Sequence, residues 1–205
     1  MPDDPKGWHS RGYLPHFDSP EMIQHVVFRT FGSLPAQALE AMQSEADARR
    51  RAVDALLDRA ARDGPLGDPA SAAIVEDALL HFDGARCRML AWCIMPNHVH
   101  VVVEQVEGWR LGDIVKSWKA FSAAAINRRH GAAGPVWAKD YFDRYVRNER
   151  HLAQTIGYVE ENPVRSKLVA ARQDWRFSSA SHHRTASLQA RSDGAGKGEP
   201  EGSRS

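Results

Sequence analysis

Two apolar stretches joined by a short polar turn dominate the middle of the chain. Residues 87–95 and about 98–104 are rich in Val, Ile, Met and Cys, and Pro96-Asn97 between them is a typical turn dipeptide. Residues 24–31 have the β-branched and aromatic content of a strand, with apolar side chains in both alternating sets. Because both faces of that strand are partly apolar, we expect it to lie inside a sheet.

Helical periodicity marks most of the remaining chain. Helices are predicted over about 33–62, 70–82, 111–129 and 149–162, and a short strand near 142–146. The last helix is expected to stop near Asn162, because Pro163 disfavours helical geometry in the residue before it. The helices of 36–82 carry no residues that suggest chemistry, so we expect them to cover one face of the sheet. Residues 1–20, rich in Pro, Gly and His, are expected to be irregular.

Composition indicates a soluble globular protein of one domain. The chain has 205 residues, of which 42% are apolar and 26% charged. No apolar run approaches the roughly 18 residues of a membrane span, and the acidic, Pro-rich start is unlike a signal peptide. Cys87 and Cys93 lie too close on one strand to form a disulfide. We therefore expect a cytoplasmic protein with reduced thiols.

The domain boundaries follow from the same patterns. We expect a single domain over 1–183, with 36–82 as a helical insertion between strands. Residues 184–205 are mainly Ser, Gly, Arg and Glu. Such a segment buries too little apolar area to offset its ordering entropy, so the tail is expected to be disordered.

The small net charge of +1 hides an uneven distribution. Residues 1–107 carry 10 basic and 16 acidic side chains, a net of −6, whereas residues 108–176 carry 13 and 7, a net of +6. A basic block suits a polyanion such as nucleic acid. A solvated surface balanced by the acidic half explains it equally well.

Two histidines open the strand after the Pro96-Asn97 turn. His98 and His100 share one face of an extended strand, with Cα atoms about 6.6 Å apart at about 3.3 Å per residue. Two imidazoles at this spacing can bind one divalent cation. By itself, a His-x-His pair in a strand is more often structural than a metal site.

The helix expected at 149–162 carries a tyrosine and an asparagine beside its apolar stripe. Leu152, Ile156 and Val159 define that stripe. Tyr158 and Asn162 are neighbours at i and i+4 on its flank, a position that suits the wall of a site. From position alone, a boundary tyrosine that reaches solvent is the commoner case.

Four sequence blocks resemble those of a known family. His98-Val-His100 after Met-Pro-Asn resembles the HUH motif of single-strand DNA nucleases, and Tyr158-Val-Glu-Glu-Asn162, with the Pro-Val-Arg-Ser-Lys that follows, resembles the tyrosine helix of their single-tyrosine branch. Trp137-Ala-Lys-Asp-Tyr-Phe-Asp-Arg144 and Arg11-Gly-Tyr-Leu-Pro-His-Phe17 resemble further blocks of the REP-associated tyrosine transposases within that insertion-sequence-200-like branch. The blocks occur in the family's order over about residues 8–170.

The resemblance implies a fold and a chemistry. The fold would be an α+β HUH nuclease fold, with a central antiparallel, ferredoxin- or RRM-like sheet and helices packed on it. His98, His100 and Asn162 would hold Mg²⁺ or Mn²⁺, and Tyr158 would attack the scissile phosphate to give a 5′-phosphotyrosine link. The protein would be a transposase of repetitive palindromic or insertion-sequence DNA, nucleoid-associated, acting on single-stranded or hairpin DNA as a monomer or homodimer.

Other tyrosines and a set of cations complete the candidates. Tyr13, Tyr141 and Tyr145 are weaker nucleophile candidates, and Tyr141 lies between acids that would oppose a phenolate. Trp118 falls on the apolar stripe of its helix and is expected in the core. Candidate DNA contacts are Lys116, Lys119, Arg144, Arg147 and Arg165.

Two alternatives to the tyrosine transposase stay open. One keeps the fold without catalysis, as a sequence-specific DNA-binding protein derived from a transposase. Binding alone needs none of the residues His98, His100, Tyr158 and Asn162, which argues against it. The other is a metal-dependent phosphodiesterase that uses activated water, with a structural Tyr158.

Overall fold

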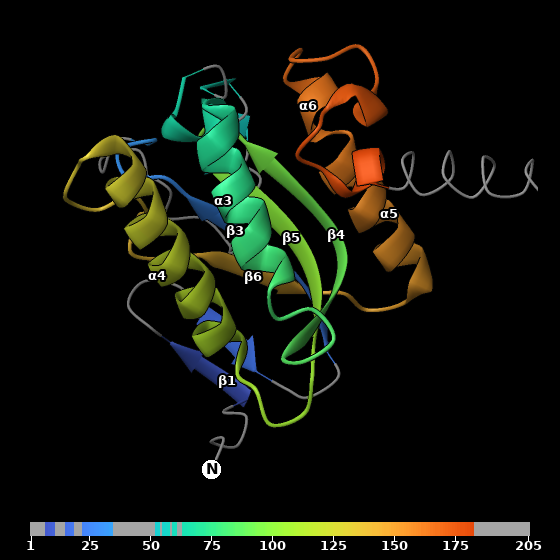
Figure 1. The fold of residues 1–205 in the computed structure, drawn as a ribbon. Helices are drawn as coiled ribbons and strands as arrows, with labels where there is room; N and C mark the ends of the chain where they lie inside the picture. The colour runs from blue at the N-terminus through green and yellow to red at the C-terminus, as the bar shows by residue number, and fades with distance from the viewer. Residues whose placement is uncertain are drawn as a thin grey trace, which may run out of the picture.

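A four-stranded antiparallel sheet forms the centre of the protein, in the strand order β4-β5-β3-β6 (Figure 1). The computed structural model describes residues 7–10, 15–18, 22–34, 52–53, 55–57, 59–60 and 63–182. The strands of the sheet are β3 (Ile23–Arg29), β4 (Cys87–Met95), β5 (His98–Gln105) and β6 (Phe142–Tyr145). β3 lies between β5 and β6, which confirms the expected interior strand, and β4, β5 and β6 lie where the sequence predicts strands.

The helices follow the predicted order. They are α3 (Pro69–Leu80), α4 (Leu111–His130), α5 (Glu149–Glu160) and the short α6 (Asn162–Arg165), with 3-10 turns η1 (Pro65–Gly67) and η2 (Arg172–Asp174). Asp68 caps α3 by accepting bonds from the backbone of Ala70 and Ser71. Asn148 caps α5 in the same way, accepting from the backbone N–H of His151. Both polar caps fix the residue at which the helix begins.

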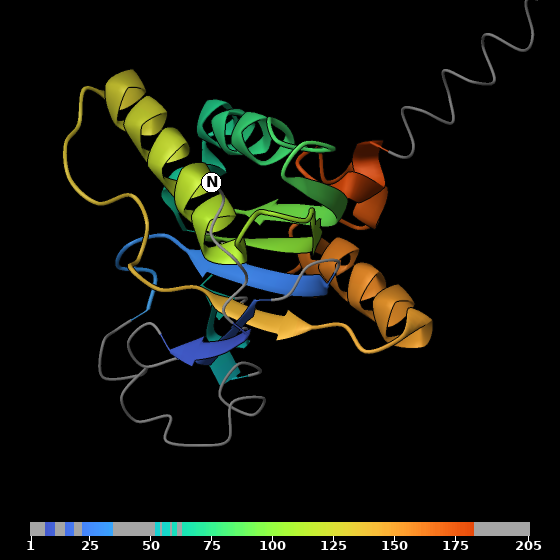
Figure 2. The ribbon, with the colours of Figure 1, turned by 90° about the horizontal axis from the view of Figure 1, so that it is seen from below.

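Strand register divides the sheet into two faces. Val26 and Phe28 of β3 point to the face covered by α3 and α4, where they pack with Val101, Trp118 and other core residues. Trp118 is 1% exposed, which confirms its expected place in the core. We call this side the α3/α4 face. Figure 2 shows α3 and α4 on one side of the sheet and α5 on the other.

The opposite side, here the α5 face, holds the alternate residues of each strand. Val102 packs with α5 residues such as Val159, whereas Val27 packs with Val53 and Leu57, from helical residues between 52 and 59. The expectation that the helices of 36–82 cover one face is therefore wrong. Two amphipathic stripes predict that both helices are buried but do not specify the face, and the Gly- and Pro-containing residues 63–69 carry the chain from one face to the other.

The expected end of the tyrosine helix also needs correction. α5 ends at Glu160, and Asn162 begins α6 instead of closing α5. Pro163 occupies the first turn of α6, where its missing N–H costs no hydrogen bond. Proline thus starts a second short helix here, and Asn162 still follows Tyr158 by one turn of chain.

The structure differs from the prediction at the N-terminal end of the described chain. β1 (Gly7–Ser10) and β2 (Pro15–Asp18) form an antiparallel pair where irregular chain was expected. The segment after η2 packs along the outer edge of β4, where the Ile94 N–H donates to Phe177 O and the Trp175 indole N–H donates to Ile94 O. The expected tail and most of the helix before residue 52 lie outside the described residues.

Cys87 and Cys93 are buried and are not joined in a disulfide, as predicted. Across the described ranges, no helix is long and apolar enough to cross a membrane.

Candidate metal and tyrosine site

Three histidines meet in the middle of the α5 face. His98 and His100 come from β5 and His25 from β3, and each is at most 2% exposed. In the antiparallel register His100 lies opposite Val27, and His25 lies opposite Val102. Directly opposed residues share a face, so the pairing of β3 with β5 brings His25 diagonally next to His100.

The two β5 histidines point their Nε2 atoms at each other, 2.9 Å apart. Two ligands at about 2.1 Å from an octahedral cation, on neighbouring vertices, lie about 3.0 Å apart. The separation therefore matches two adjacent ligands of one cation. Burial lowers the pKa of His98 to about 3, which leaves its imidazole neutral, the form that binds metals.

Asn162 is an unsatisfied polar residue at the start of α6, four residues after Tyr158. Its side chain is fully buried, and neither its amide oxygen nor its amide nitrogen has a hydrogen-bond partner among the described residues. A buried unsatisfied group costs about 1–3 kcal/mol, so the Asn162 amide is a candidate ligand whose oxygen a bound cation would satisfy. No three His, Cys, Asp or Glu side chains in the described ranges could hold a metal together. A cation site built on His98 and His100 would therefore need a donor of another type, and the Asn162 amide is a candidate.

Tyr158 stands at the edge of the histidine cluster. The centre of its ring lies 5.8 Å from that of His100 and 5.9 Å from that of His25, edge-on in both cases. α5 therefore packs close enough to bring its tyrosine to the histidines. Glu160 at the end of α5 is anchored by the Ser179 hydroxyl at 2.9 Å and by Arg172 at 3.2 Å.

Two residues of this site were missed in the sequence. His25 Nε2 lies 3.1 Å from His100 Nδ1, and Asn97 Oδ1 lies 2.6 Å from His98 Nδ1. The available signals were a lone histidine in a buried interior strand and an asparagine directly before the first histidine. Neither specifies a partner, because the contacts depend on strand register and on the turn.

The candidate DNA-binding residues divide between the two faces. Arg165 lies over the Tyr158 ring at 4.6 Å, and Arg144 lies opposite His25 in the β3–β6 register. Arg147 lies 5.5 Å from the centre of the Tyr145 ring, just after β6. Arg144 and Arg165 are therefore on the side of the histidines.

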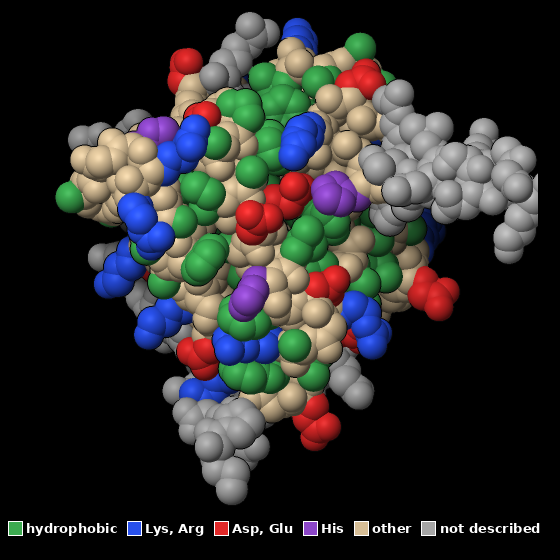
Figure 3. Space-filling view, in the orientation of Figure 1, with side chains coloured by type: hydrophobic (Ala, Val, Ile, Leu, Met, Phe, Trp, Pro, Cys, Tyr) green, Lys and Arg blue, Asp and Glu red, His purple; other side chains and the backbone are tan. Residues whose placement is uncertain are grey.

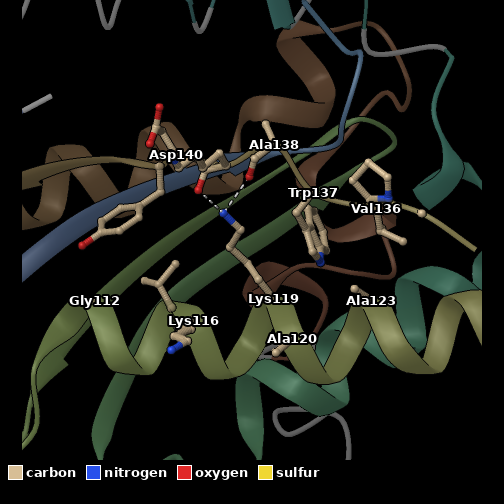
Figure 4. Close-up of a pocket in the computed structure, with 14 residues that line it drawn as sticks. Gly112, Lys116, Lys119, Ala120, Ala123, Val136, Trp137, Ala138 and Asp140 are labelled. Carbon is tan, nitrogen blue, oxygen red and sulfur yellow. Dashed lines mark hydrogen bonds between the residues drawn. The ribbon is translucent and has the colours of Figure 1, made fainter. Parts of the chain in front are cut away.

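Lys116 and Lys119 belong to the other side. Both line a pocket of about 630 Å³ between α4 and residues 134–141, and Lys119 reaches across it (Figure 4). The Lys119 ammonium donates to the carbonyls of Ala138 and Lys139, at 2.7 and 2.9 Å. Figure 3 shows Lys and Arg side chains along the outer side of α4.

The rival tyrosines are less well placed. Tyr141 is 7% exposed and lines the α4 pocket instead of the histidine cluster. Tyr145 ends β6 and contacts Arg147. Tyr13 lies outside the described residues.

Comparison with known proteins shows similarity to one family over part of the chain. Residues 78–162 match the family model of IS200-like transposases. This segment contains β4, β5, α4, β6 and α5, and therefore both histidines, Tyr158 and Asn162. The similarity to single-tyrosine transposases that the sequence indicates is confirmed for this part of the chain.

Two proteins of Haemophilus influenzae are similar to part of this chain. A putative REP-associated tyrosine transposase of Haemophilus influenzae is 24% identical over 103 residues, covering 44% of this chain and 57% of the relative. An uncharacterized protein of the same organism is 26% identical over 99 residues, covering 38% of this chain and 54% of the relative. The chain spans just over half the length of these two curated relatives.

A solved structure shows the same architecture. It is that of a REP-associated tyrosine transposase bound to a REP hairpin, with a TM-score of 0.55 and 15% identity over 87% of this chain and 86% of that chain. At this identity the similarity concerns the fold. It confirms the expected α+β fold with a central antiparallel sheet.

Proposed function

We propose that this protein is a metal-dependent single-stranded DNA endonuclease and strand transferase that acts through a 5′-phosphotyrosine intermediate. The observation that carries the proposal is the position of Tyr158 beside the converging pair His98 and His100. A binding protein needs no phenol next to two buried imidazoles whose Nε2 atoms meet. The match to IS200-like transposases supports a role in DNA transposition.

The proposed cofactor is Mg²⁺ or Mn²⁺, held by His98, His100 and Asn162. When bound, such a cation polarises the scissile phosphate and stabilises negative charge on its oxygens. The side chains around it fix where the phosphate can lie. Both imidazoles are fully buried on a rigid interior strand, and the Asn162 amide has no competing partner among the described residues.

Tyr158 is the proposed nucleophile. Its phenolic oxygen attacks phosphorus, the phenol loses its proton, and a new tyrosyl O–P bond forms as the bond from phosphorus to the 3′ oxygen breaks. The 3′ oxygen leaves and gains a proton. Because the phosphotyrosine link keeps a phosphodiester bond, a second 3′-hydroxyl can reverse the step and rejoin strands without a nucleotide cofactor.

The proposed substrate is single-stranded or hairpin DNA, of the repetitive palindromic or insertion-sequence type. Arg144 and Arg165 lie on the side of the tyrosine, where they can contact the phosphates next to the cleaved bond. Lys116 and Lys119 lie at the α4 pocket, where they can contact a more distant part of the same DNA. Contacts on both sides fit a folded hairpin that extends around the sheet edge, and a DNA ligand would make the protein nucleoid-associated.

Incubation with a labelled hairpin oligonucleotide and Mn²⁺ tests the proposal. We expect a covalent protein–DNA adduct that resists denaturing gel electrophoresis and disappears in Tyr158→Phe. Tyr145→Phe is the matched control and should retain the adduct. Cleavage by Tyr158→Phe would indicate activated water instead of tyrosine, and binding without cleavage by the wild type would indicate a DNA-binding protein.

A further inference from the structure

One continuous chain of hydrogen bonds runs through the histidine cluster. Asn97 Nδ2 donates to the Leu57 carbonyl at 3.1 Å, and Asn97 Oδ1 lies 2.6 Å from His98 Nδ1. His98 Nε2 lies 2.9 Å from His100 Nε2, and His100 Nδ1 lies 3.1 Å from His25 Nε2. Every link joins buried atoms, so each contact needs one donor and one acceptor.

The first link determines the state of His98. A backbone carbonyl only accepts hydrogen bonds, so the Asn97 amide must turn its NH₂ group to Leu57. Its oxygen then faces His98 and can only accept. His98 Nδ1 must therefore carry a proton, and in the neutral ring Nε2 presents a lone pair. Reversing the amide would set its oxygen against the Leu57 carbonyl, two acceptors in contact.

The tautomers of His100 and His25 follow from that of His98. Because His98 Nε2 carries no proton, the 2.9 Å contact requires His100 Nε2 to donate in the metal-free protein. His100 Nδ1 is then unprotonated and accepts from His25 Nε2. In this state only His98 is ready to bind a cation, since the ligand atom of His100 is protonated.

We propose that Asn97 and His25 are positioning residues that set the tautomers of the two cation ligands. Asn97 fixes the tautomer of His98, and His25 allows His100 to change its tautomer when a cation binds. The inference rests on the proposed function, because it takes His98 and His100 as the ligands. Both need a lone pair on Nε2 when a cation is bound, so His100 must then carry its proton on Nδ1 and donate to His25.

The exchange conserves protons. One proton leaves His100 Nε2 for solvent, one moves from His25 Nε2 to His100 Nδ1 along their hydrogen bond, and one is taken up at His25 Nδ1. The hydrogen bond between the rings is kept and reversed in direction. His25 can perform this role because a neutral imidazole both donates and accepts.

Residues between β3 and β4 help to hold the turn that precedes His98. Leu57, which supplies the terminal acceptor, belongs to the helical residues between 52 and 59, and Leu66 donates its N–H to Pro96 O at 3.0 Å. On the other side, the Thr30 backbone N–H and hydroxyl both donate to Asn97 O, at 2.9 and 3.0 Å. The turn before His98 is thereby held from both sides.

Long-range ¹H–¹⁵N NMR of histidine-labelled protein at pH 8 tests the proposal without any variant. We expect the Nδ1–H tautomer of His98 both after chelation and with saturating Mg²⁺. His100 should change from Nε2–H to Nδ1–H on Mg²⁺ addition, and His25 should change with it. An Nε2–H tautomer of His98, or a His100 tautomer that Mg²⁺ leaves unchanged, overturns the proposal.

Variants separate this role from a structural one. Asn97→Asp keeps an acceptor and should keep the His98 tautomer, whereas Asn97→Leu and His25→Phe should weaken Mn²⁺ binding about 10–100-fold by calorimetry, the usual effect of removing an outer partner of a ligand. Gln105→Leu removes a buried amide from the same strand and should leave Mn²⁺ affinity and tautomers unchanged. Equal loss of affinity in Gln105→Leu would indicate a merely structural effect.

The result is distinguishable from that of the proposed function. Tautomers in the metal-free protein do not depend on DNA cleavage. An enzyme that forms the Tyr158 adduct with the wrong His98 tautomer refutes only this inference. A protein with the expected tautomers and no adduct supports the inference and refutes the nuclease.

Discussion

The guanidinium carbon of Arg165 lies 4.6 Å from the centre of the Tyr158 ring. The two residues come from consecutive helices, α6 and α5, and the turn at Glu161 between them brings the cation over the phenol. Arg165 is exposed, so its charge also remains available to a phosphate. One side chain can thus hold the proposed nucleophile in place and attract a phosphate.

Replacing Arg165 tests this double role. Arg165→Gln should lower the rate of adduct formation on hairpin DNA by about tenfold, which corresponds to about 1.4 kcal/mol. The reason is the loss of a contact over the ring and of a charge beside the phosphate. Lys167→Gln, which removes another exposed cation of the same segment, should change the rate by less than about twofold. Equal losses in the two variants would mean that only net charge matters.

Asn162 should limit the stability of the metal-free protein. Its buried amide lacks partners in the described structure, so Asn162→Leu should raise the free energy of unfolding without metal by about 1 kcal/mol. The same change should abolish the rise in Tm that Mn²⁺ gives the wild type, because binding to the folded state alone stabilises it. Thermal unfolding with and without Mn²⁺ measures both effects. Destabilisation together with a retained Mn²⁺ response would assign the amide a structural role.

Gly64 should tolerate no side chain, because it contacts the turn before His98. A Cβ atom there would lie 2.1 Å from the carbonyl oxygen of Pro96, a backbone atom that cannot rotate away. Gly64→Ala should therefore cost about 1–3 kcal/mol by chemical denaturation, as overpacking usually does, and should weaken Mn²⁺ binding.

Gly67→Ala is the matched control for Gly64→Ala. Its Cβ would lie 3.8 Å from the Pro96 side chain, an ordinary contact. We expect a change of less than about 0.5 kcal/mol and unaltered Mn²⁺ affinity. Similar effects of the two substitutions would show that the segment responds to side chains generally and not to contact with the turn.

Lys119 should make stability depend on pH in the alkaline range. Burial, with a smaller contribution from Arg29 and opposed by Asp140, lowers the pKa of Lys119 from 10.5 to about 8. Between these values the unfolded chain binds the proton and the folded chain does not, so stability rises with pH. The free energy of unfolding of the wild type relative to Lys119→Met should therefore increase from pH 8 towards pH 10.5. A constant difference over this range in denaturant titrations would contradict the shift.

Much of the fold is determined by the sequence alone. The apolar runs, the Pro96-Asn97 turn and the helical stripes predict β3, β4, β5, α3 and α4 closely, because local patterning reports which residues must be buried. The hydrophobic pattern did not predict the pairing of β1 with β2, or which face of the sheet the helical residues between 52 and 59 cover. Those depend on contacts between segments far apart in sequence, such as Leu57 with Asn97.

The candidate site also combines features that local sequence patterns predict with features that packing between elements sets. Local periodicity predicts that His98 and His100 share one strand face and that Tyr158 lies beside the apolar stripe of its helix, since period 2 and period 3.6 fix which side chains are neighbours within an element. Tertiary packing brings His25 to His100, lays Arg165 over Tyr158, and puts Lys116 and Lys119 on the opposite side of the sheet from the histidines. The physical reason is that strand register and helix packing set distances between elements, and no local pattern encodes them.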